Sequence, residues 1–190
     1  MLTEVFQFIA SSEYKKLGLE YIEINLSVSQ CMHHGLADSI LESMSRYGVS
    51  SNQVNLEITE SAASYDQSVM SENLEQLSAA GITFSLDDYG TGYSNMYRIA
   101  ALPLKIVKLD KTFVNNQNSK MWTILQNTVR MIKDLNMEIV VEGIETEEMV
   151  KKFSDLKCDF IQGYFFSKPI PQREFVEFID RWNNRQKVNA

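Results

Sequence analysis

The chain has 190 residues, of which 44% are hydrophobic and 23% charged, a composition typical of a globular protein and unlike that of a disordered tail. Its formal net charge of -7 argues against broad, non-specific binding to nucleic acid polymers or anionic membranes, so an anionic substrate would need a metal ion. No apolar run is long enough for a membrane span, and no signal-like N-terminus is present. Cys31 and Cys158 lie far apart and suggest free, buried thiols, so we expect a cytoplasmic protein.

Apolar periodicity predicts a strict alternation of helices and strands along the chain. The predicted strands are 21–26, 54–60, 82–87, 104–110, 138–142 and 159–162. Predicted helices carry apolar residues at helical spacing: Leu2, Val5, Phe6 and Ile9; Leu36, Ile40, Leu41 and Met44; Met70, Leu74 and Leu77; Met96, Ile99 and Ala100; Ile124, Leu125, Val129, Met131, Ile132 and Leu135; Met149, Val150 and Phe153; and Phe175, Phe178, Ile179 and Trp182. Gly18, Gly48 and Gly81 are expected just beyond the ends of the first three.

Alternating strands and helices at a spacing of roughly 25 to 30 residues indicate βα units and a parallel sheet. No linker, low-complexity run or second domain interrupts the pattern, so we expect one domain over 1–190. Polar residues follow every strand, whereas a doubly wound open sheet collects them at one switch point. This distribution favours a (β/α) barrel over an open sheet.

The polar residues at the strand ends form a plausible site for phosphoryl-transfer chemistry. In chain order they are Asn25, Glu57, Glu60, Asp87, Asp88, Lys108, Asp110, Glu142 and Gln162. An amide, several carboxylates and one lysine at the same edge of a sheet supply hard oxygen ligands for two divalent cations and a fixed positive charge.

Each of these residues also has a structural interpretation. Asn25 could cap a turn, Glu57 could face solvent, Lys108 could form a surface ion pair with Asp110, and Glu142 could begin a loop. Six such coincidences at six strand ends are harder to explain than one. His33-His34 is expected in an exposed loop, because no third imidazole or cysteine is spaced to complete a zinc site.

The segment 86–94, Leu-Asp-Asp-Tyr-Gly-Thr-Gly-Tyr-Ser, links the third strand to the next helix. Adjacent carboxylates raise each other's pKa unless a positive charge lies between them, so Asp87 and Asp88 suggest a divalent cation. Gly90 and Gly92 would let the backbone approach a ligand closely.

The segments 23–27, 56–60, 86–94, 107–110, 141–146 and 162–169 resemble, in order and spacing, the successive motifs of EAL domains. The resemblance covers the chain from the first helix to the end. It implies a TIM-like barrel that hydrolyses the second messenger cyclic di-GMP to linear pGpG with Mg²⁺ or Mn²⁺, and a catalytic group formed by Lys108, Glu142 and Asp88.

The resemblance assigns a role to each matching position. Asn25, Glu57 and Asp87 would bind one cation and Asp87, Asp88 and Glu142 the second, while Lys108 would hold or deprotonate the attacking water. Gln162 and Pro169 would lie at the nucleotide. Glu60 would support the loop that contains Gly90, Thr91 and Gly92, which in the family lies near a dimer contact.

The Glu-Ala-Leu segment that names the family, with its cation-binding glutamate, is absent from this sequence, and so is a nearby arginine that binds the substrate phosphate. The resemblance therefore implies an incomplete barrel with about six of eight strands, two unpaired sheet edges and impaired turnover. The unpaired edges predict self-association, as a homodimer or otherwise. The alternatives are an inactive descendant that binds cyclic di-GMP or a protein, and another metal-dependent barrel hydrolase.

Overall fold

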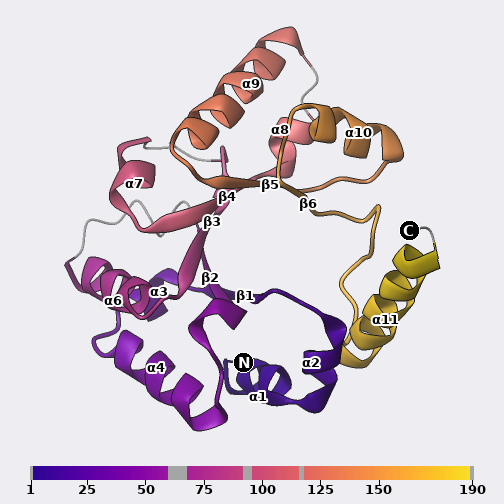
Figure 1. Cartoon of the computed structure of the whole chain (residues 1–190). Helices are drawn as coiled ribbons and strands as arrows, with labels where there is room; N and C mark the ends of the chain where they lie inside the picture. Colours follow the sequence, from indigo (N-terminus) through magenta and orange to yellow (C-terminus); the bar gives the residue numbers. More distant parts are fainter. Residues whose placement is uncertain (1, 60–67, 92–95, 116–117, 189–190) are drawn as a thin grey trace.

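The structure is a computed structural model that describes residues 2–59, 68–91, 96–115 and 118–188 (Figure 1). One parallel sheet contains the six described strands in chain order. They are β1 (Ile22–Leu26), β2 (Val54–Thr59), β3 (Thr83–Tyr89), β4 (Leu104–Leu109), β5 (Glu138–Val141) and β6 (Phe160–Ile161). The strands curl into a half-barrel surrounded by helices, so the predicted incomplete TIM-like barrel is confirmed.

The helices lie outside the curled sheet (Figure 1). The apolar periodicity predicts the longer ones, but not the short helices at Val28–Cys31 and Lys111–Asn115. They are α1 (Leu2–Ala10), α2 (Ser12–Leu17), α3 (Val28–Cys31), α4 (Leu36–Tyr47), α6 (Ser68–Ala79), α7 (Met96–Ala101), α8 (Lys111–Asn115), α9 (Ser119–Asp134), α10 (Glu147–Asp155) and α11 (Gln172–Val188), with a short 3₁₀ helix η1 (Ser51–Gln53). None of the helices in these described ranges is both long and apolar enough to cross a membrane.

Local signals at the helix ends act as predicted, with one exception. Gly18 and Gly48 cap α2 and α4 in the left-handed conformation, with φ of 69° and 66°. The first predicted helix is in fact two, because the Ser11 hydroxyl accepts a hydrogen bond from the Tyr14 backbone N–H at 3.1 Å and thereby caps a new helix.

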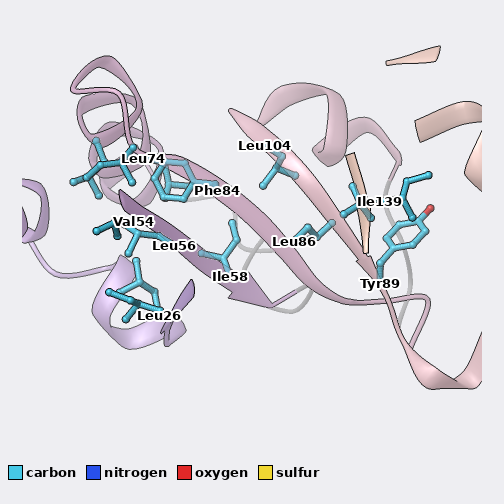
Figure 2. Packing of buried hydrophobic residues seen from close by; sticks show 14 of the residues in the cluster. Leu26, Val54, Leu56, Ile58, Leu74, Phe84, Leu86, Tyr89, Leu104 and Ile139 are labelled. Atoms are coloured by element: carbon cyan, nitrogen blue, oxygen red, sulfur yellow. The ribbon is translucent and has the colours of Figure 1, made fainter. Parts of the chain in front are cut away.

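The two faces of the sheet differ in polarity. On the face that packs against helices, Leu56, Phe84 and Val107 are fully buried and belong to one continuous apolar core. Figure 2 shows part of this core, including Leu74 of α6 in the same cluster as Phe84 of β3. The residues that alternate with them, among them Glu57 and Lys108, face the concave inner side, as strand geometry requires.

Several residues expected inside the core are more exposed than predicted. Ile124 and Leu135, assigned to a well-buried helix, are 53% and 42% exposed, because α9 buries only the stripe that contains Leu125, Val129 and Ile132. Cys31 is a buried free thiol as predicted, whereas Cys158 is only partly buried.

The barrel is open between β1 and β6, whose outer edges have no neighbouring strand in the described sheet. Residues from both edges line one mostly apolar cavity of about 550 Å³, including Ile22 of β1 and Phe160 of β6. Helix α11 lies along this open side and contacts α2, where the Asn183 side chain donates a hydrogen bond to the Leu17 carbonyl at 2.9 Å (Figure 1). Helices α11 and α2 therefore contact each other at the opening, although β1 and β6 do not pair there.

Candidate active site

Lys108 of β4 lies at the centre of the polar end of the sheet. This residue is 3% exposed, and its ammonium Nζ donates a hydrogen bond to Glu57 of β2. Nζ also lies 2.9 Å from Glu142 Oε1 and 3.8 Å from Asp87 Oδ1. A fourth carboxylate, Glu23 of β1, approaches Nζ to 3.6 Å. One cation therefore faces four carboxylates, which leaves the cluster with an excess of negative charge.

These contacts decide between the two interpretations of several residues. Glu57 does not face solvent, since it is 5% exposed, and Lys108 is not a surface residue. In the described part of the chain Asp110 forms no ion pair with Lys108; its Oδ1 accepts a hydrogen bond from the Thr112 N–H at 2.8 Å at the start of α8. The carboxyl ends of parallel strands meet at one edge, which is why residues far apart in sequence gather here.

Strand β3 continues two residues beyond the predicted end at Asp87, because it contains a bulge. The register pairs Leu86 with Val107 and then Tyr89 with Leu109, so β3 has one residue more than β4 over this span. Asp88 takes the left-handed conformation, with φ of 57°. The bulge interrupts the alternation of side chains, so consecutive aspartates contribute to adjacent parts of one site.

The loop after β3 is stabilised by protein contacts. Thr91 closes a turn, since its backbone N–H and its hydroxyl donate to the Asp88 carbonyl at 3.2 and 3.0 Å. Gly90 has φ of 101°, and a Cβ there would lie 2.1 Å from the Phe113 ring. Gly90 therefore permits a close approach of the loop to the Phe113 ring. Gly92 and Glu60 lie outside the described residues.

Burial shifts the protonation of the carboxylates in the cluster. Desolvation raises the pKa of Glu57 to about 7 against the opposing charge of Lys108, and Asp87 and Glu23 raise it further. Desolvation likewise raises the pKa of Glu142, opposed by Lys108. Burial acts to lower the pKa of Lys108, but Glu57 and Glu142 outweigh it and raise that pKa. Lys108 is therefore held as an ammonium ion.

The arrangement fits divalent cations. Two groups of carboxylates have one oxygen each within 4.8 Å of the others: Glu57, Asp87 and Glu142, and Asp88, Asp110 and Glu142. Asp87 Oδ1 is buried without a hydrogen-bond partner in the described structure, which is unfavourable unless another electrophile binds it. Hard, anionic oxygens at this spacing are the ligands that Mg²⁺ and Mn²⁺ prefer.

The remaining predicted residues in the described chain are not members of the two carboxylate groups. Asn25 is paired with Glu57 in the register of β1 and β2, and its side chain is exposed. Gln162 and Pro169 are exposed and line a cavity of about 590 Å³ that also contains Tyr164 and Lys168. Gln162, together with Ile161, Ile170 and Phe175, also lines the cavity at the opening beside β1.

The sequence reasoning missed two members of the site. Glu23 is not among the predicted site residues, although its position two residues before Asn25 places both on the inner face of β1. Asp110 was noted at a strand end but not included among the cation ligands, although it is 7% exposed and lies in the second carboxylate group. Asp110 directly precedes α8, where its Oδ1 accepts the hydrogen bond from the Thr112 N–H.

The half-barrel is an incomplete TIM-like barrel with a candidate metal site at the ends of its strands. The EAL domain family matches residues 1–169, and the chain belongs to that family.

Curated relatives are longer than this chain. MucR of Pseudomonas aeruginosa, named a bifunctional diguanylate cyclase and cyclic di-GMP phosphodiesterase, is 36% identical over 160 residues, which is 83% of this chain and 23% of MucR. RocR of the same organism, named a cyclic di-GMP phosphodiesterase, is 30% identical over 159 residues, 83% of this chain and 41% of RocR. The chain thus spans less than half the length of these relatives.

Solved EAL structures share the fold. The PaMucR phosphodiesterase in complex with c-di-GMP superposes with a TM-score of 0.83 at 34% identity, over 92% of this chain and 71% of that one. Klebsiella pneumoniae BlrP1 with manganese and cyclic di-GMP gives 0.78 at 26% identity, over 88% and 43%. The EAL domain of Mycobacterium smegmatis DcpA gives 0.81 at 27% identity, over 94% and 83%.

Proposed function

We propose that this chain is a metal-dependent cyclic di-GMP phosphodiesterase domain that spans 1–190 and forms pGpG. The observation that carries the proposal is the buried Lys108 ammonium among carboxylates from different strands, beside an Asp87 oxygen that has no hydrogen-bond partner in the described structure. Relatives named phosphodiesterases, at up to 36% identity, support the substrate.

The proposed cation ligands draw on both carboxylate groups and on Asn25. Asn25, Glu57 and Asp87 would hold one Mg²⁺ or Mn²⁺ ion, and Asp87, Asp88 and Glu142 would hold the other, with Asp110 of the second carboxylate group as a further candidate ligand. Bound cations supply charge neutralisation of the phosphate and a more acidic water. The overall reaction adds water to phosphorus and breaks one phosphodiester P–O bond, so one ring opening yields a linear dinucleotide.

Lys108, Glu57 and Glu142 form the proton-handling part of this proposal. The Lys108 ammonium, held by Glu57 and Glu142, orients the oxygen of the attacking water. Burial raises the pKa of Glu57 to about 7, so a cation bound at this carboxyl would compete with a proton near neutral pH. Gln162 and Pro169 border the cavity in which the nucleotide would lie.

We also propose that the 190-residue polypeptide by itself turns over slowly, because its sequence contains no Glu-Ala-Leu segment to complete the ligand set. Loss of one positioned electrostatic element in such a site costs on the order of 10²–10³ in rate. The same observation favours a second candidate, an inactive EAL domain that binds cyclic di-GMP or a protein partner.

A combined assay separates the two candidates. Formation of pGpG is measured with millimolar Mn²⁺, and cyclic di-GMP binding is measured by calorimetry with and without Mn²⁺. Slow turnover that Lys108→Ala abolishes supports the phosphodiesterase, whereas binding without any turnover supports the inactive domain. Absence of both Mn²⁺ and cyclic di-GMP binding would refute both candidates.

The open edge supports a further proposal, that two copies of the chain associate through β1 and β6. The accessible surface is 11414 Å², against about 9,300 Å² expected for a compact monomer of this mass. The excess is about 2,100 Å² per chain, or about 4,200 Å² for two chains, which lies in the range that large homodimer interfaces bury in total. Light scattering should give a dimer, and Phe160→Lys at the β6 edge should yield a monomer, while Ile124→Lys on α9 should not. A monomeric wild-type chain would contradict this.

A further inference from the structure

A group of polar side chains crosses the inner face of β1, β2 and β3 just before the strand ends. The register aligns Glu23 with Asn55 and Asn55 with Thr83. Asn55 Nδ2 donates a hydrogen bond to Thr83 Oγ1 at 2.9 Å, and the Ser85 hydroxyl donates to Asn55 Oδ1. Ser85 Oγ also lies 3.5 Å from Glu23 Oε1.

Glu23 is the charged member of this group, and the neutral members do not need a carboxylate to complete their hydrogen bonds. Asn55 and Ser85 are fully buried, yet they satisfy each other and Thr83 through their own hydrogen bonds. A carboxylate beside them adds negative charge to a cluster that already exceeds its cation, which is unfavourable unless the charge has a partner. The partner is Lys108, whose Nζ lies 3.6 Å from Glu23 Oε2.

The two oxygens of Glu23 therefore face different neighbours. Oε1 faces the Ser85 hydroxyl, and Oε2 faces the Lys108 ammonium. Strand alternation adds that Glu23 and Asn25 share the inner face of β1, so Glu23 lies one inward position below the strand end. A carboxylate in this place attracts Nζ away from the strand-end oxygens.

We propose that Glu23 is a positioning residue that holds the Lys108 ammonium between the polar group and the strand-end carboxylates, and so keeps Asp87 available to a cation. This inference rests on the proposed metal site. Without the Glu23 charge, Nζ would be attracted only by Glu57, Asp87 and Glu142, and would compete more strongly with a cation for their oxygens.

The test compares Glu23→Gln with Glu20→Gln, which removes the same charge from an exposed position three residues away. Mn²⁺ affinity is measured by electron paramagnetic resonance of the free ion, without any substrate. We expect the Mn²⁺ dissociation constant to rise roughly tenfold in Glu23→Gln and less than about twofold in Glu20→Gln. Equal changes in both variants would overturn the inference while leaving the metal site intact.

A second measurement addresses Lys108 directly and does not require a metal. In protein labelled with ¹⁵N-lysine and kept in EDTA, the Lys108 ammonium should give a slowly exchanging signal that shifts or broadens in Glu23→Gln and stays unchanged in Glu20→Gln. If the Lys108 signal neither shifted nor broadened in Glu23→Gln, the inference would be overturned, whatever the Mn²⁺ result. A wild-type chain that binds no Mn²⁺ but shows the shift would refute the proposed function and retain the Glu23–Lys108 contact.

Discussion

The two faces of the curled sheet differ in what their residues contribute, although they belong to the same strands. On the outer face, Leu56 and Phe84 are fully buried against helices and carry no polar atom in their side chains. On the inner face, Glu57 and Lys108 are almost as buried but are charged. Burial stabilises the first set by removing apolar surface from water, whereas it penalises the second set unless each charge finds a partner. Within one strand, outward-facing residues therefore stabilise the fold, and the inward-facing residues that alternate with them form the candidate site.

Substitutions on the outer face should have the largest effect on stability. Phe84→Ala removes a fully buried ring, so the free energy of unfolding should fall by about 3–5 kcal/mol. Urea denaturation followed by circular dichroism measures this loss. Ile124→Ala, at a residue 53% exposed, serves as the control and should change stability by less than about 0.5 kcal/mol. If Phe84→Ala left the free energy of unfolding nearly unchanged, the stated difference between the two faces of the sheet would be wrong.

A substitution on the inner face should increase stability in the absence of metal rather than decrease it. Asp87→Asn removes one of the excess carboxylates around Lys108, so stability without metal should rise by about 1 kcal/mol. Loss of a shared ligand should weaken Mn²⁺ binding by more than about 100-fold, beyond the effect of outer-shell changes. Melting curves in EDTA measure the expected gain in stability, and Mn²⁺ titration measures the expected loss of affinity. Asp134→Asn, 75% exposed on α9, is the matched charge control.

The pH dependence of stability should show the burial of Glu57. Its folded pKa of about 7 lies above its ordinary value of 4.5, so this group's stabilising contribution is complete below pH 4.5 and is lost as pH rises through 7. In EDTA the free energy of unfolding should fall by about 1–3 kcal/mol over that interval. Glu57→Gln should remove this component. An unchanged pH slope in that variant would show that Glu57 is ionised throughout.

A solvent-exposed pair should have the smallest effect. Arg46 and Glu42 on α4 lie 3.0 Å apart with side chains 67% and 73% exposed. Water and salt screen such pairs, so Arg46→Ala should reduce stability by about 0.5 kcal/mol or less. Urea denaturation at low and high salt measures this. A loss comparable to that of Phe84→Ala would mean that exposure does not separate the two kinds of contact.

The sequence by itself determined the strands, the longer helices, their order and most members of the candidate site. Apolar periodicity and the glycines after the helices located every described strand, because strands and helices bury residues at different repeats. The polar residues Glu57, Asp87, Lys108 and Glu142 could be grouped in advance, since parallel strands bring their carboxyl ends to one edge. Neither inference needs a distance between side chains.

Only the tertiary structure decided features that depend on register and on contacts between distant segments. The bulge that brings Asp88 beside Asp110 arises from the pairing of β3 with β4, which neither strand's sequence specifies alone. The reason for Gly90 is the Phe113 ring, which approaches from the next βα unit. Glu23 reads as an irregularity in its own strand and becomes a partner of Lys108 only when the sheet curls, because curvature brings β1 across from β4.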